Sequence, residues 1–209
     1  MNELNTTRPA VASADALGRR RQAAGAVAFD PALGRKIALA YDELYVSLFD
    51  CPGARRAWDA MAADEVDLFT RATQRFHIQP WPGDGQPYAD SAAMIADVLL
   101  RRHLWVFAGG DPHPVRTGME TYRGRAVHDI YAHAIPGNSF SPAGELAAFR
   151  VSMPLYSTQA LPALATDNLG PTAWYYFHPS NEGKPHSERR WPVQKAGLLP
   201  RELWERLLP

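Results

Sequence analysis

Apolar side chains recur at spacings of three and four residues along much of this chain, and this periodicity is the strongest constraint on its fold. Such spacing gathers apolar groups on one face of an α-helix. The pattern is clearest in two stretches: Ile37, Tyr41, Leu44, Tyr45 and Leu48, and then Trp58, Met61, Leu68 and Phe69 within residues 54–76. Weaker signals predict helices over residues 91–102, 120–134, 142–153 and 157–168. At the C-terminal end, Leu203, Trp204 and Leu207 are expected to dock on the body of the protein.

Short stretches rich in aromatic and branched residues favour strands instead. Residues 77–80 precede a loop rich in turn residues, and residues 104–107 end at two glycines. The aromatic run at residues 174–178 predicts a further strand or aromatic wall. We therefore expect an α+β fold, mainly α-helical, in a single domain with a small two- or three-stranded sheet.

The first 25 residues show no apolar periodicity, so we expect a flexible N-terminal arm at 1–25 and a single globular domain at 26–209. Lys plus Arg equals Asp plus Glu at 22 each, which makes a nucleic-acid partner unlikely on charge grounds. The single cysteine, Cys51, excludes an intramolecular disulfide and a cysteine-based zinc site. No apolar run reaches the roughly 18 residues that a membrane span requires. A cytoplasmic location without a membrane partner is therefore expected.

Residues 124–133 and 141–145 carry the strongest signal of chemistry. They hold two imidazoles and two carboxylates inside segments that otherwise resemble buried helices, where charged groups are costly unless paired, ligating or catalytic. Asp129 and His133 lie four residues apart and share a helix face. On an ideal α-helix, His128 points roughly 140° away from His133. We therefore expect Asp129 to pair with His133, and the two histidines not to share one ion easily.

Glu145 lies near the start of the next predicted helix, for which Ser141 is the expected N-cap. It is one position too late for a reciprocal capping box, which would require Glu or Gln where Gly144 stands. A first-turn carboxylate favoured by the helix dipole would explain it, but its place at the edge of the apolar stripe favours a role in the site. Of the remaining histidines, His113 between two prolines is expected to be exposed, and His178 to be packed.

The order of these motifs resembles a family of uncharacterised proteins and domains from phage and bacterial genomes, some of them parts of very large phage polypeptides. The resemblance covers about residues 37–200 and has the Arg-Ala-Val-His-Asp and Gln-Lys blocks as its most specific parts. The matching motifs are Pro87–Tyr88, Met94 to Asp97, Leu104, Arg125 to Asp129 with His133, Gly144–Glu145, Tyr156–Ser157, Thr166–Asp167, and Gln194–Lys195 before residues 198–200. The family carries no assigned activity, so the resemblance implies a site without naming a reaction.

Two positions depart from the family pattern. A third histidine of the family, on the same helix face as its glutamate, is replaced here by Ser152, and an arginine is missing from the run at residues 166–170. A metal-binding pair at positions 145 and 152 would be sensible on one helix face, and this chain lacks half of it. The departures suggest conversion to metal-free acid–base chemistry or to another specificity, and a chain that stands alone would suit small-molecule biosynthesis.

The leading hypothesis is an enzyme that acts on a small polar substrate, amino-acid-like or anionic, without a cofactor. In it His133, oriented by Asp129, moves a proton, and Glu145 binds or deprotonates an amine. Groups expected to bind the substrate are Arg125 and Lys195 for an anion, with His128, Tyr156 and Gln194 as further contacts.

Two alternatives remain open. The first is a mononuclear zinc or iron enzyme with His133, Asp129 and Glu145 as ligands, joined by His128 or His178. The second is a non-enzymatic binding or assembly protein, with a protein partner or a second copy of the chain, in which the polar cluster is a buried structural network.

Overall fold

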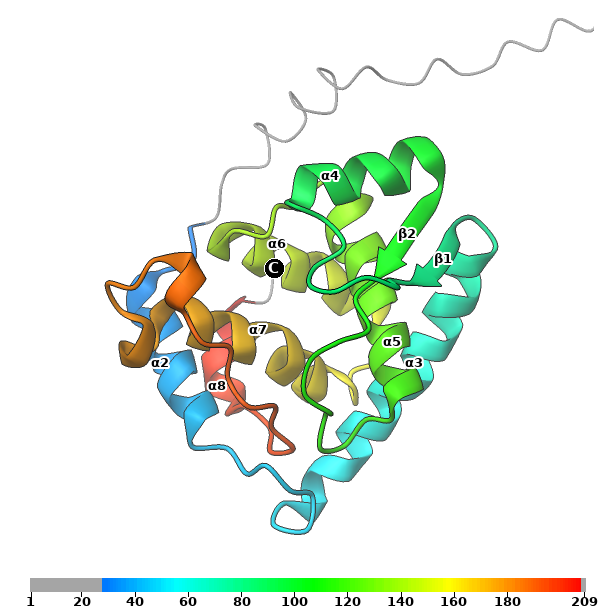
Figure 1. Cartoon of the computed structure of the whole chain (residues 1–209). Helices are drawn as coiled ribbons and strands as arrows, with labels where there is room; N and C mark the ends of the chain where they lie inside the picture. Colours follow the sequence, from blue (N-terminus) through cyan, green and yellow to red (C-terminus); the bar gives the residue numbers. More distant parts are fainter. Residues whose placement is uncertain (1–27, 208–209) are drawn as a thin grey trace, which may run out of the picture.

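Helices make up most of residues 28–207, the part of the chain that the computed structural model describes (Figure 1). The α-helices are α2 (Pro31–Asp42), α3 (Arg55–Thr73), α4 (Ser91–Ala96), α5 (Gly118–Val127), α6 (Pro142–Ser152), α7 (Leu161–Phe177) and α8 (Arg201–Trp204). Short 3-10 turns lie at Pro52–Ala54, Met153–Leu155, Pro179–Asn181, His186–Glu188 and Glu205–Leu207. Two segments are π-helical, Asp97–Arg101 after α4 and His128–Ala134 after α5. The expected N-terminal arm lies outside the described residues.

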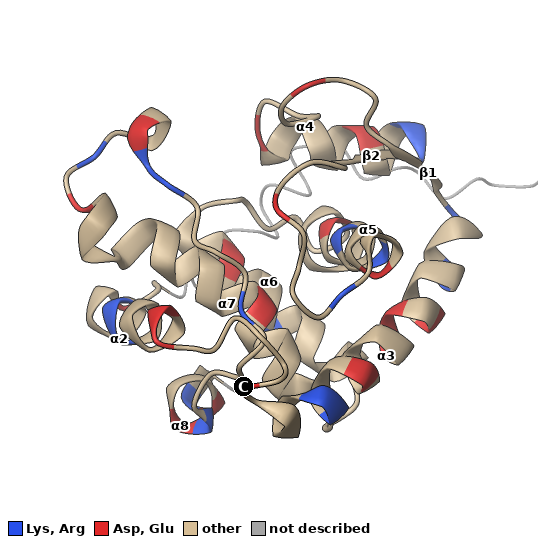
Figure 2. Cartoon of the chain, turned by 60° about the horizontal axis from the view of Figure 1, so that its bottom comes forward, with Lys and Arg blue, Asp and Glu red and all other residues tan. Residues whose placement is uncertain are grey.

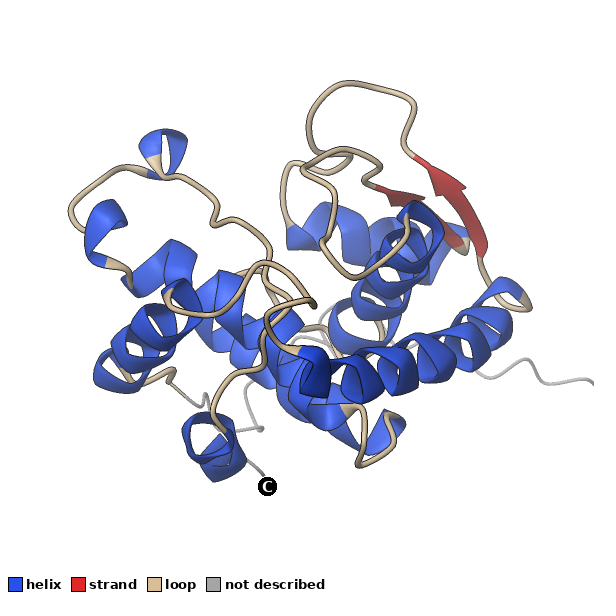
Figure 3. Cartoon of the chain, turned by 90° about the horizontal axis from the view of Figure 1, so that it is seen from below, coloured by secondary structure: helices blue, strands red, loops and turns tan. Residues whose placement is uncertain are grey.

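The predicted sheet is present and two-stranded. Strands β1 (His77–Pro80) and β2 (His103–Val106) run parallel, with His77 opposite His103 in the register (Figure 3). Leu104 and Val106 of β2 are fully buried and belong to an apolar cluster with α4, α5 and the two π-helical segments. The mainly α-helical α+β class predicted from the sequence is thus confirmed.

The pairing of α2 with α7 organises the other side of the molecule (Figure 1). Each helix contributes a glycine where an aromatic ring of the other comes close: Gly34 of α2 lies under Phe177, and Gly170 of α7 under Tyr41. A β-carbon at either glycine would overlap the facing ring. Both glycines therefore let the two helices approach one another.

The predictions for residues 157–178 were wrong in one respect. Helix α7 continues through Gly170 and Pro171 to Phe177, so the aromatic run at 174–178 is the last helical turn and not a strand. The residues on either side of Pro171 are buried against α2 and α6, and packing of this kind outweighs the cost of one proline within a helix. The first predicted helix, in turn, ends earlier than expected, at Asp42.

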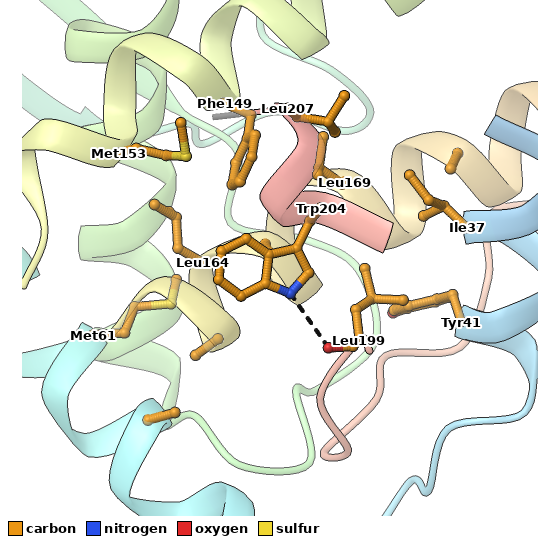
Figure 4. Close-up of a cluster of buried hydrophobic side chains, with 14 of the residues drawn as sticks. Ile37, Tyr41, Met61, Phe149, Met153, Leu164, Leu169, Leu199, Trp204 and Leu207 are labelled. Atoms are coloured by element: carbon orange, nitrogen blue, oxygen red, sulfur yellow. Dashed lines mark hydrogen bonds between the residues drawn. The ribbon is translucent and has the colours of Figure 1, made fainter. Parts of the chain in front are cut away.

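A larger apolar cluster fills the space among α2, α3, α6 and α7 (Figure 4). Trp204 of α8 projects into it, is 3% exposed, and donates a hydrogen bond from Nε1 to the carbonyl oxygen of Leu199 at 3.4 Å. Leu207 is buried in the same cluster, so the expected docking of the C-terminal segment is confirmed for the described residues. Helix α6 contributes to this cluster, whereas α5 and the π-helical segment after it contribute to the cluster beneath the sheet.

Acidic and basic residues both occur on α3, α5 and α8 (Figure 2). No helix within residues 28–207 combines the length and apolar character needed to cross a membrane.

Candidate functional site

A π-helical turn brings His128 and His133 together. In a π-helix the backbone bonds run from residue i to i+5, so side chains five apart lie much closer to one face than they do in an α-helix. The Nε2 atoms of the two rings are 2.9 Å apart, and the rings meet edge to face with centroids 4.6 Å apart. The expectation that these histidines face apart was therefore wrong, because it assumed α-helical geometry.

Glu145 reaches the same point from α6. The hydroxyl of Ser141 caps this helix by accepting a hydrogen bond from the Gly144 backbone N–H at 3.1 Å, and Glu145 follows in the first turn, as predicted. One carboxylate oxygen of Glu145 lies 3.6 Å from His128 Nε2 and 3.5 Å from His133 Nε2. Within residues 28–207, these three residues form the one group of His, Cys, Asp and Glu whose ligand atoms cluster closely enough to hold a metal ion. We call them the His–His–Glu cluster.

Hydrogen bonding fixes the orientation of His133. Its Nδ1 lies 3.2 Å from the carbonyl oxygen of Asn138, which can only accept, so Nδ1 carries a proton and Nε2 presents its lone pair to the cluster when the ring is neutral. The amide nitrogen of Asn168 lies 3.4 Å from Nδ1 of His128 and donates to it as placed, so the proton of the neutral His128 ring lies on Nε2, facing His133. A half-turn of that amide would present its oxygen and fix the His128 proton on Nδ1 in the same way. Both rings are thus held by groups outside the cluster.

Charge within the cluster favours an ionised glutamate beside a protonated histidine. Burial alone would raise the pKa of Glu145, but the imidazoles of His128 and His133 outweigh it and hold that pKa at about 2. Burial alone would lower the pKa of His128, but Glu145, with Asp129 and Asp167 further away, raises it above 6.5. The cluster therefore attracts positive charge, which a proton or a metal cation can supply.

The spacing of the three donor atoms suits one ion. A zinc ion lies about 2.0–2.1 Å from a histidine nitrogen, so two such ligands are separated by roughly 2.9 Å at a right angle and roughly 3.4 Å at the tetrahedral angle. The observed separations of 2.9, 3.5 and 3.6 Å lie at or close to these values. His133 is fully buried, whereas the side chains of His128 and Glu145 are 26% and 16% exposed, which leaves one side of the cluster open.

The predicted pair of Asp129 and His133 is not formed. Both ring nitrogens of His133 face other groups, and Asp129 makes no hydrogen bond or ion pair with any described residue. Burial raises the pKa of Asp129, although His128 and His133 oppose that change. Asp129 therefore lies near the cluster without belonging to it, and His128 is the residue of the same segment that contacts His133.

The other predicted site residues are dispersed. Lys195 donates from Nζ to the carbonyl oxygen of Asp42 at 2.6 Å, at the end of α2, and neither Lys195 nor Gln194 has a hydrogen bond or ion pair to the cluster. His178 stacks on Trp174 and is packed, as expected, and it lies outside the His–His–Glu cluster. Ser152, where the family pattern has histidine, bonds the backbone of its own helix.

A second buried polar group adjoins the cluster through α7, and sequence reasoning missed most of it. Arg116 pairs with Glu65 of α3 and, at 2.8 Å, with Asp167 of α7, next to the Asn168 that faces His128. Burial raises the pKa of Glu65 to about 8 even though Arg116 opposes the change. Burial also raises the pKa of Tyr156, and Glu65 adds to this effect, which places that predicted substrate contact beside this second group.

The expectation that His113 is exposed was wrong. Its side chain is 5% exposed and packs edge to face on Trp58. Its Nδ1 accepts hydrogen bonds from the backbone N–H groups of Val115 and Arg116 at 3.1 and 3.2 Å, and burial lowers its pKa. The sequence signal that could have indicated this was the turn closed by His113 before the Thr117 N-cap of α5.

No protein-family model, no curated protein and no solved structure matches this chain. The resemblance to a phage and bacterial family therefore stays a prediction, and the function has to be argued from the cluster itself.

Proposed function

We propose that the protein is a mononuclear metal-dependent enzyme whose ion is held by His128, His133 and Glu145. The observation that carries the proposal is the convergence of two imidazole Nε2 atoms and one carboxylate oxygen within ion-sharing distance. Two histidines with one carboxylate are a common ligand set for catalytic zinc and for iron(II), and both ions keep open positions there. Such an ion would polarise a substrate oxygen or activate a bound water.

The charges around the cluster support a divalent cation. Glu65, Asp129, Glu145 and Asp167 are four acids gathered near His128, whereas Arg116 and Arg125 are the two guanidinium groups among them. With neutral imidazoles and ionised acids, this group would carry two negative charges, which are costly to bury. Protons on Glu65 and on the histidines can offset that charge, and so can one divalent ion. Metal binding should therefore release protons.

The test is the metal content of protein purified without chelator, measured by elemental analysis together with the affinity for added zinc and iron(II). Glu145→Gln keeps the shape of the side chain, and His128→Ala removes a partly exposed ligand; each should abolish stoichiometric metal. Asp129→Asn should retain it, since Asp129 stands outside the cluster. The exposed His77 provides the control, and His77→Gln should bind metal as the wild type does. Retention of metal by Glu145→Gln, or loss of metal in Asp129→Asn alone, would refute this ligand set.

A second candidate is metal-free acid–base catalysis on a small polar substrate, and one observation favours it. The 2.9 Å between the two Nε2 atoms is also a hydrogen-bond distance, so one proton can sit between the rings while Glu145 stabilises a protonated His128. In this version the acid–base pair is His128 with Glu145 and not His133 with Asp129. Protein that binds neither zinc nor iron(II) but loses activity on His128→Ala would favour this candidate. Amino-acid-like specificity, a biosynthetic role and a cytoplasmic location remain predictions under both candidates.

A further inference from the structure

A pocket of about 390 Å³ lies between the loop that follows β2 and one face of α5. Gly109, Gly110 and His113 line it from the loop, and Tyr122 and Arg125 line it from the helix. Arg125 is one turn before His128 on the same face of the helix, about 5 Å along its axis. The pocket therefore reaches to within about one helical turn of His128 along α5.

Arg125 is oriented within this pocket but not neutralised. Its Nη1 atom donates to the carbonyl oxygens of Phe107 and Gly109 at 2.7 and 2.8 Å, and the Phe107 ring lies 5.2 Å from the guanidinium carbon. These bonds use both protons of Nη1 and leave the edge formed by Nε and Nη2 without a protein partner among residues 28–207. No carboxylate of the described residues lies within ion-pair distance of Arg125, whereas the neighbouring Arg116 has two.

The loop keeps the free edge of Arg125 open. Gly110 has a φ of +94°, a left-handed conformation that favours glycine, and a β-carbon there would lie 3.3 Å from Nη2 of Arg125. Two other residues of the lining, His113 and Arg116, each hold a buried nitrogen without a hydrogen-bond partner among the described residues. These atoms are His113 Nε2, which carries the ring proton because Nδ1 accepts two bonds and which lies 3.7 Å from Oδ1 of Asp167, and Arg116 Nε. The lining is thus rich in donors.

We propose that this pocket binds the carboxylate group of a small molecule through the Nε–Nη2 edge of Arg125, with the rest of the molecule directed toward His128. A planar guanidinium edge matches a carboxylate by two parallel hydrogen bonds. The one carboxylate of the lining belongs to Asp111, an exposed residue whose charge is screened by solvent. The binding site stands on the pocket itself; its role as the substrate site rests on the proposed function.

The test uses the full chain, stripped of metal and desalted. Succinate is the probe, and succinamide, its uncharged analogue, is the control ligand. In NMR spectra of the wild type, succinate should shift the backbone signals of Gly109 and Gly110 and the side-chain signal of Arg125, and succinamide should not. Arg125→Gln should weaken succinate binding by about tenfold or more. Arg55→Gln removes an exposed arginine of α3 and should leave binding unchanged.

If Arg125→Gln fails to fold, the NMR signals of the wild type that succinate shifts decide the proposal by themselves. Shifts elsewhere in the protein, equal binding of succinamide, tighter binding of inorganic phosphate, or no binding of succinate would each overturn it. Because the protein is metal-free in this experiment, a failure of the metal site leaves the result intact. Conversely, a chain that binds metal but not succinate would keep the proposed function and refute the carboxylate site.

Discussion

Single side chains at the site differ in the protonation state that the fold favours. The folded protein stabilises ionised Glu145, whose pKa is held at about 2 against 4.5, because two imidazoles outweigh its burial. It disfavours ionised Asp129, whose pKa is raised above 3.8 mainly by burial. Two acids on neighbouring helices therefore have opposite effects on stability as the pH changes.

We predict that, in metal-free protein, Glu145→Gln lowers the free energy of unfolding at neutral pH and has less effect in acid. A carboxyl with a depressed pKa contributes its full stabilisation above pH 4.5 and loses it as the pH falls toward about 2. The difference between wild type and variant should therefore shrink across that window, as measured by chemical denaturation at a series of pH values.

Asp129→Asn is the matched comparison. Because the pKa of Asp129 is raised, its ionisation costs stability as the pH rises above 3.8, and the variant should be as stable as the wild type at neutral pH or more stable. A larger loss of stability in Asp129→Asn than in Glu145→Gln would mean that Asp129, and not Glu145, pairs with the histidines.

Among the elements, those with a regular apolar stripe were predictable and those that break helical geometry were not. Helix α3 and both strands lie where the residue pattern placed them, and Asp90 caps α4 through its side chain as its residue type suggests. The π-helical turn at His128–Ala134 gives no separate signal, because one extra residue per turn leaves composition and polarity unchanged. For this reason the sequence indicated His133 and Glu145 as central site residues, and gave His128 only the role of a substrate contact or an additional ligand, not that of the direct partner of His133.

Helix α7 shows a second reason why local sequence was not enough to predict an element. Gly170 and Pro171 are strong helix-ending signals, and only contacts with residues far away in the sequence overrule them. The same contacts explain why residue 170 is glycine, since Tyr41 lies against it. Neither fact is available from local sequence alone.

Gly170→Ala should destabilise the protein by about 1–3 kcal/mol, because a methyl group there overlaps the buried Tyr41 ring and must push α2 away from α7. Urea denaturation followed by circular dichroism would measure the change. Gly53→Ala is the control, since no atom lies within 4 Å of the β-carbon it adds. Equal stabilities for the two variants would contradict the close approach of α2 and α7.

At the scale of the whole molecule, the site lies where the His128–Ala134 segment contacts α6, and the two elements belong to different apolar clusters. Ala126 and Ile130 belong to the cluster beneath the sheet, whereas Leu146 and Phe149 of α6 belong to the larger one. The class of fold could be predicted from periodicity, but this junction could not, because it depends on which faces of separate helices meet. The distances from Glu145 to the two histidines are a product of that packing, whereas the distance between the histidines is set within one π-helical turn.

Trp204→Ala should lower the free energy of unfolding by about 3–5 kcal/mol, since it empties space in the larger cluster and releases α8. Trp191→Ala changes the same residue type at a position that is 57% exposed, and should cost less than about 1 kcal/mol. Denaturant titration of both variants provides the comparison. A small effect of Trp204→Ala would show that α8 is not part of the cooperative core.

The pairing of α2 with α7 has a consequence for how the chain folds during synthesis. The two helices are separated by the whole stretch from Glu43 to Ala160, so their contact closes a very long loop, and the apolar face of α2 has no partner until α7 has left the ribosome. The ligand residues of the site, by contrast, come from one helical hairpin between His128 and Glu145, whose contacts are local in sequence and quick to form. We therefore expect the hairpin to assemble early and α2 to dock only once α7 is available, with α2 the described segment most in need of protection in a nascent or truncated chain.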